Sequence, residues 1–112
     1  MHAVDIERKG RVAVVAASGE LDAFAATDLE AAFDDVGEER RILADLRRVS
    51  FMDSTALGVL VRRVSQLNDD GAQVRVVLPR GTARRIFEIT TLDTVLPVAA
   101  DTTAALDALD GR

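Results

Sequence analysis

The sequence predicts an α/β fold, a mixed, mostly parallel sheet of about five strands covered by about four helices. Two observations lead to this prediction. Short apolar segments typical of buried strands alternate along the chain with longer segments whose apolar residues recur at helical spacing. The first two strand-like segments are separated by a tight turn at Lys9-Gly10, so they must be antiparallel. The later strands are joined through helices, which is the connection that parallel strands require.

Length and composition indicate one soluble domain spanning residues 1–112. The chain is 48% hydrophobic and 29% charged, which is ordinary for a globular protein. It has no apolar run of the ~20 residues that a membrane helix needs, no visible signal peptide and no cysteine, so we expect a cytoplasmic location without membrane insertion. The net charge of −5 argues against nonspecific binding of nucleic acid.

The first third of the chain predicts two strands and a helix. Residues 4–7 alternate between apolar and charged, and residues 12–17 form an apolar run that we expect Gly19 to end. Asp22 is a suitable N-cap for the following helix, and Gly37 is a suitable terminator. The residues predicted to line the buried face of this helix are Leu29, Ala32, Phe33 and Val36.

The middle of the chain predicts a buried strand, a loop and an amphipathic helix. The strand covers residues 42–46, and the helix runs to about Asn68, where Asn68-Asp69-Asp70-Gly71 is a stop signal. The spacing of apolar residues predicts that one face of this helix is buried, carrying Leu57, Leu60, Val61, Val64 and Leu67.

The last third predicts a strand over residues 74–78, closed by Pro79, and a helix over residues 82–89 that buries Ile86 and Ile89. A short strand near residues 95–98 follows. Asp101-Thr102-Thr103 then caps a last helix that holds Leu106 and Leu109.

Asp53-Ser54-Thr55, at the start of the central helix, has two interpretations. All three side chains serve well as helix caps, and capping alone accounts for them. Alternatively, a hydroxyl in the first turn is open to a second protein, and a phosphate placed there would lie beside free N–H groups and the positive end of the helix dipole. A helical wheel places Thr55, Val59, Arg62 and Gln66 away from the apolar stripe. An outward Val59 flanked by Thr55 and Arg62 indicates a contact surface.

The sequence argues against catalysis. A serine hydrolase needs a base for Ser54, but the single histidine is His2, in a terminus expected to be mobile. There is no glycine-rich nucleotide loop. Asp22, Asp45 and Asp53 could form a metal site only if they converged, and carboxylates at helix starts are more often caps. We therefore expect no enzyme activity, no cofactor and no metal.

Three segments of the chain resemble the STAS domain family, which includes anti-sigma factor antagonists. The central segment, Phe51-Met52-Asp53-Ser54-Thr55-Ala56-Leu57-Gly58, resembles the family signature. Gly19-Glu20-Leu21-Asp22 resembles a second family element, and Ile89-Thr90-Thr91-Leu92-Asp93 with Leu96-Pro97-Val98 a third. Some members carry glycine at the positions of Ala56 and Thr91. The resemblance covers about residues 4–109 and implies one STAS domain.

The resemblance implies a partner-switching regulator. Unphosphorylated, it would bind an anti-sigma factor that is also a Ser/Thr kinase, thereby controlling sigma-factor-dependent transcription. Phosphorylation of Ser54 by that kinase, with Thr55 as the alternative site, would release the partner, and a Ser/Thr phosphatase would reverse the change. The residues expected to bind the partner are Asp22, Asp53, Ser54, Thr55, Gly58, Val59 and Arg62. The alternative function is a small STAS subunit of a membrane transport complex for lipids or anions.

Overall fold

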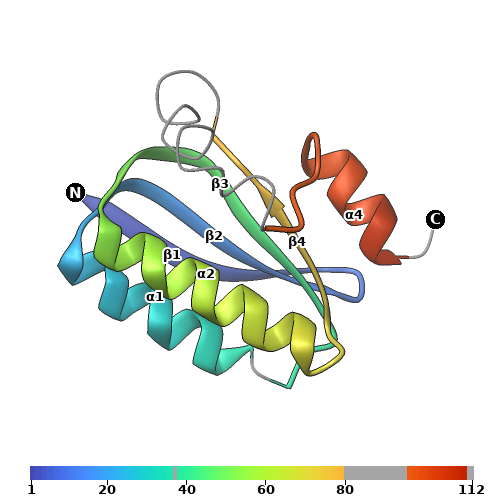
Figure 1. The fold of residues 1–112 in the computed structure, drawn as a ribbon. Helices are drawn as coiled ribbons and strands as arrows, with labels where there is room; N and C mark the ends of the chain where they lie inside the picture. Colours follow the sequence, from blue (N-terminus) through green and yellow to red (C-terminus); the bar gives the residue numbers. More distant parts are fainter. Residues whose placement is uncertain (37, 80–95, 111–112) are drawn as a thin grey trace.

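The computed structural model describes residues 1–36, 38–79 and 96–110, and its strands form one four-stranded sheet in the order β1-β2-β3-β4 (Figure 1). β1 and β2 are antiparallel, whereas β2–β3 and β3–β4 are parallel. The elements are β1 (His2–Lys9), β2 (Val12–Leu21), α1 (Ala23–Asp35), β3 (Arg41–Met52), α2 (Ser54–Asp69), β4 (Gln73–Val77) and α4 (Thr102–Asp110).

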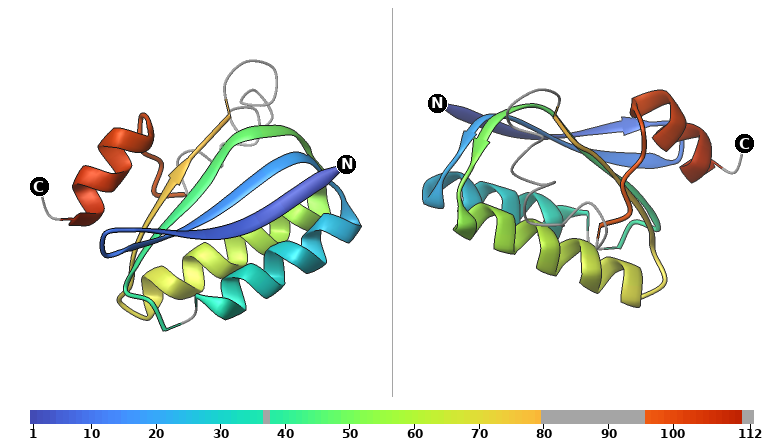
Figure 2. Two further views of the ribbon diagram at one scale, coloured as in Figure 1. Left: turned by 180° about the vertical axis from the view of Figure 1, so that it is seen from behind. Right: turned by 45° about the horizontal axis from the view of Figure 1, so that its top comes forward.

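Helices cover both faces of the sheet. α1 and α2 lie side by side on one face, and α4 lies on the other (Figures 1 and 2). Side chains such as Phe33 of α1, Leu60 of α2 and Ile42 of β3 form the larger core between the helix pair and the sheet. Leu43 and Val77 meet Leu109 of α4 in a smaller core on the opposite face. Among the described residues, no helix is long and apolar enough to cross a membrane.

Several sequence predictions are confirmed, and they are the ones that depend on local chemistry. The sheet is mixed, with the first two strands forming an antiparallel hairpin that turns at Gly10, where φ is +61°. Asp22 caps α1, whose predicted apolar face is buried throughout. Gly71 follows α2 with φ +88°, a left-handed conformation that glycine adopts without strain. Gly37, the expected end of the first helix, lies outside the described residues.

β2 and β3 are longer than predicted. β2 continues past Gly19 to Leu21, and β3 runs through the expected loop to Met52. The pairing of the two strands is irregular between Ala16 and Ser18 and between Gly19 and Glu20. Such bulges break the alternation of apolar and polar side chains while the strands stay paired. The strands predicted from that alternation therefore ended too early. Gly19 has φ +79°, and a Cβ there would lie 2.1 Å from the Met1 carbonyl oxygen. Glycine is therefore required within the strand.

The described residues contain four strands and three helices, slightly fewer than predicted. The fifth strand is reduced to one parallel bridge between Val76 and Val98. Val76 donates to the Pro97 carbonyl and accepts from the Ala99 amide, both at 2.9 Å. Pro97 has no N–H with which to extend this ladder. The helix predicted over residues 82–89 and the motif segment 89–93 lie outside the described residues.

The predicted buried face of α2 is confirmed for Leu60, Val64 and Leu67, but the prediction that Val59 faces outward is wrong. Val59, expected to face outward, is 8% exposed and belongs to the main core, while Leu57 and Val61 are only partly buried. The residues of α2 that are buried are Ala56, Val59, Leu60, Val64 and Leu67. The reason is that α2 packs against α1 as well as the sheet, and Val59 lies on the side of α2 that faces α1. The sequence alone did not show where α1 would lie.

Candidate functional site

The site is formed where two parallel strands end together. Leu21 at the end of β2 is paired with Met52 at the end of β3. The Asp53 amide donates to the Leu21 carbonyl at 3.0 Å, which holds the two strand ends side by side. Each strand is followed directly by a helix, so the N-termini of α1 and α2 open at the same edge of the sheet (Figure 1). Asp22 and Asp53, 31 positions apart, are thereby brought to neighbouring positions.

Both aspartates cap their helices. Oδ1 of Asp22 accepts hydrogen bonds from the amides of Phe24 and Ala25, each at 3.0 Å. Oδ1 of Asp53 accepts from the Ala56 amide at 2.9 Å. The hydrogen bond from Ala25 is the main reason why the pKa of Asp22 lies below its usual value, because it stabilises the carboxylate. The capping interpretation is therefore right for Asp53, and Ser54 is the first residue of the helix.

Ser54 and Thr55 are exposed in the first turn of α2. Asp53 satisfies the Ala56 amide through its side chain and the Leu57 amide through its carbonyl. The amides of Ser54 and Thr55 have no hydrogen-bond acceptor within the described part of the chain. Unsatisfied N–H groups at a helix start favour an anion. A negatively charged group added to Ser54 would meet donors that are already oriented.

The groups needed for hydrolytic or metal chemistry at Ser54 are engaged elsewhere. His2 lies in β1, and its Nε2 is 2.6 Å from a carboxylate oxygen of Asp28 on α1, so the expected mobile terminus is an ordered strand. Asp45 forms two hydrogen bonds with the Arg47 guanidinium, at 2.8 and 2.9 Å. The three aspartates considered as metal ligands thus have separate roles as two caps and one ion pair.

The outer side of α2 differs from the prediction in one residue. Thr55, Gly58 and Arg62 are exposed, whereas Val59 is buried beneath them against α1. A Cβ added at Gly58 would meet no atom within 4 Å. The contacts of the described residues therefore do not explain a glycine in the middle of this helix, where it costs about 0.5–1 kcal/mol relative to alanine.

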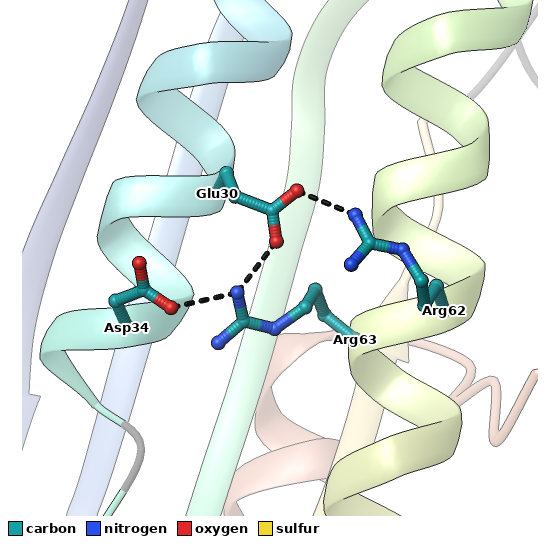
Figure 3. Close-up of polar contacts among 4 residues, drawn as sticks. All are labelled: Glu30, Asp34, Arg62 and Arg63. Carbon is teal, nitrogen blue, oxygen red and sulfur yellow. Dashed lines mark hydrogen bonds and ion pairs between the residues drawn. The ribbon is translucent and has the colours of Figure 1, made fainter.

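An ion-pair cluster joins α1 to α2 (Figure 3). Glu30 of α1 accepts from Arg62 and from Arg63 of α2, each at 2.5 Å, and Arg63 also lies 2.8 Å from Asp34. The hydrogen bond from Arg63 is the main reason why the pKa of Glu30 is lowered. Arg62 keeps a half-exposed side chain, so it can still contact a partner while its guanidinium is held in place.

Three features beside this site were not predicted from the sequence. A groove of about 460 Å³ runs between α1 and α2, with Thr55 and Val59 on one wall. Phe24, in the first turn of α1, is 82% exposed, and Phe51, near the end of β3, is 43% exposed. The position of Phe24 was available from sequence, because it lies off the apolar face that contains Leu29. The groove could not be predicted from the sequence, because it exists only once the two helices are packed together.

Comparisons with known proteins agree with the sequence motifs. The family model of the STAS domain matches residues 3–105. The anti-sigma-B factor antagonist of Staphylococcus aureus is 33% identical over 86 residues, covering 75% of this chain and 80% of that protein. The crystal structure of an anti-sigma factor antagonist from Mycobacterium paratuberculosis matches with a TM-score of 0.86 at 31% identity, covering 98% and 95% of the two chains.

A further solved structure is of interest because it records a modification. The Bacillus cell fate determinant SpoIIAA in its phosphorylated form matches with a TM-score of 0.71 at 26% identity, covering 95% of this chain and 98% of that one. Nearly the whole described chain is therefore similar to proteins of this group.

Proposed function

This chain belongs to the STAS domain family, and we propose that it is an anti-sigma factor antagonist whose state is switched at Ser54. In its unphosphorylated form it binds an anti-sigma factor that is a Ser/Thr kinase, which releases the sigma factor for transcription. The kinase then phosphorylates Ser54, which ends the complex, and a Ser/Thr phosphatase restores the binding form. The protein acts in the cytoplasm as a binding partner and a kinase substrate, not as a catalyst.

One observation carries this proposal: an exposed hydroxyl lies in the first turn of α2, directly after one capping carboxylate and at the same edge of the sheet as a second. Ser54 follows Asp53 directly, and the parallel pairing of β2 and β3 brings Asp22 to the same edge. A kinase can reach this hydroxyl without unfolding the chain, because Ser54 is at the surface. Thr55 is the alternative site, but its β-methyl group hinders approach and its side chain borders the groove between the helices.

Phosphorylation would affect the partner more than the fold. A phosphate adds about −1.5 to −2 charges and three acceptor oxygens. Within the chain, the amides of Ser54 and Thr55 can donate hydrogen bonds to the phosphate without a change of backbone conformation. Toward a partner, the added charge joins Asp22 and Asp53, so a surface that fitted the unmodified serine would meet bulk and repulsion. The switch therefore needs no change of backbone conformation.

The binding surface for the partner consists of those predicted partner-binding residues that are exposed. Asp53, Ser54 and Thr55 lie at its centre, and Asp22 lies beside them at the start of α1. Gly58 and Arg62 extend it by two turns along α2, and the missing side chain at Gly58 allows close approach of a partner to the helix backbone. Val59 packs beneath this surface but does not contact the partner directly, because its exposed fraction is only 8%.

The test compares three forms of the protein. Ser54→Ala stays folded and binds the anti-sigma kinase whether or not ATP is present. Ser54→Asp binds more weakly than the wild type, although one carboxylate carries less charge than a phosphate. Wild type phosphorylated by the kinase binds least. Titration calorimetry with the kinase gives the affinities, and mass spectrometry maps the modified residue, with Ser50→Ala as a matched control at another exposed serine.

The proposal has two points of failure. Phosphate mapped mainly to Thr55 or Ser50 would move the switch to another residue. Equal affinity of the phosphorylated and unmodified forms would remove the switch altogether. Amide NMR spectra of the two free forms test the local mechanism separately, because shifts that spread through the sheet would indicate a conformational change instead.

A further inference from the structure

β1 is an edge strand, and one row of its backbone groups pairs with no strand in the described part of the chain. It is the outermost strand of the sheet and pairs only with β2 among the described strands. The Glu20 amide donates to the Met1 carbonyl, so residues 1 and 20 form a hydrogen-bonded pair. In an antiparallel ladder, hydrogen-bonded pairs alternate with non-hydrogen-bonded pairs, so the odd-numbered residues of β1 form the backbone hydrogen bonds to β2. The backbone groups of Val4 and Ile6 therefore point away from β2, toward the open edge.

A groove follows this edge between β1 and α1. Its volume is about 320 Å³, and its apolar lining is formed by Val4 and Ile6 of β1 with Ala31 and Ala32 of α1. A side-chain ion pair from β1 lies toward each end of the strand. His2 pairs with Asp28 at one end, and Arg8 pairs with Glu39 at the other. The part of the edge between these two ion pairs is residues 3–7, which span ~17 Å of extended chain.

The rim of this groove is acidic. Asp5, Asp28 and Asp35 line it, and no lysine or arginine does so among the described residues. All three aspartates are exposed, and the Asp28 carboxylate is paired with Nε2 of His2. A second copy of the chain that paired along the same edge would bring two acidic rims together, which is unfavourable. A segment with basic side chains would instead be attracted.

From this arrangement we propose that β1 and α1 form a second binding site, which takes an extended, basic segment of another protein as an added strand. The segment forms backbone hydrogen bonds with Val4 and Ile6. Its alternate side chains point to opposite faces, so the basic ones lie along the groove beside Ala31, with their charged ends near Asp28 and Asp35, and the apolar ones lie on the other face. This site lies apart from Ser54 and does not depend on the proposed switch.

The experiment uses the full chain, ¹⁵N-labelled, and the peptide acetyl-Arg-Val-Arg-Val-Arg-amide. We expect saturable amide shifts in β1 and along α1, with a dissociation constant of about 1 mM or lower at low salt and weaker binding as salt is added. Asp35→Asn should weaken binding by about threefold or more, because it removes one of the attracting charges. Asp107→Asn, an exposed aspartate on α4, is the matched control and should leave the affinity unchanged.

Two further peptides separate strand addition from simple charge attraction. A peptide with glutamate in place of arginine should not bind. A peptide N-methylated at the amides that face β1 keeps its charge but cannot complete the ladder, so it should lose most of its affinity. Equal binding of the N-methylated peptide would overturn the proposal, and so would the absence of saturable shifts up to about 5 mM of the arginine peptide.

Discussion

Gly58→Ala should make the protein more stable and its partner complex weaker. Gly58 lies inside α2, is exposed, and has no unusual φ. An added Cβ would meet no atom within 4 Å, so alanine introduces no clash with the described residues. Alanine also restricts the unfolded chain and favours the helix, which together stabilise by about 0.4–1 kcal/mol. For a domain of this size, that corresponds to a rise in Tm of roughly 2–6 °C.

Binding should move in the opposite direction. If a partner packs directly on the helix backbone at Gly58, the new methyl group overfills that contact. Overpacking of a close interface costs about 1–3 kcal/mol, which lowers affinity roughly 5- to 150-fold. Thermal unfolding measures the first effect, and calorimetric titration with the anti-sigma kinase measures the second.

Gln66→Ala is the matched control, because Gln66 is also exposed on α2 but lies two turns further along the helix. Glutamine and alanine have similar helix propensities, so stability should change by less than about 0.5 kcal/mol and affinity should not change. A Gly58→Ala variant that binds as tightly as the wild type would refute close approach at this position. A loss of stability would show instead that Gly58 has an intramolecular role.

Two further predictions concern the packing of α2 against α1. Val59→Asp should destabilise the fold by about 2–4 kcal/mol in chemical denaturation, because it places a carboxylate in the core, whereas Gln66→Asp at an exposed position should cost less than about 0.5 kcal/mol. An equally small effect of Val59→Asp would mean that Val59 is not buried in solution. Glu30 should add to stability above its unfolded pKa, since its folded pKa is lowered, and the contribution should be lost as pH falls through the folded value. The free energy of unfolding, measured by chemical denaturation, should therefore fall more for the wild type than for Glu30→Gln as pH is lowered from 7 to about 3. Parallel pH profiles of the two proteins would show that the pairs with Arg62 and Arg63 add nothing to stability.

Local chemistry let the sequence determine much of this protein. Asp22, Asp53 and Asp101 each accept hydrogen bonds from amides two or three residues ahead, so a cap can be recognised within four residues of sequence. The same holds for the turn at Gly71 and for the hairpin between the first two strands. The signature that contains Ser54 is likewise a continuous segment, which is why the family and the exposed serine could be identified before the fold was known.

Tertiary structure alone decided which distant residues share the site. Asp22 and Asp53 come together because β2 and β3 pair in parallel, and the bulges that set their common end are not visible in the hydrophobic pattern. Glu30 meets Arg62 because two helices pack side by side, and the same packing buries Val59. A helix shows in its sequence that it has an apolar face, but the width and direction of that face depend on every neighbour. The surface that we propose for partner binding around Ser54 is therefore defined by helix packing as much as by its own residues.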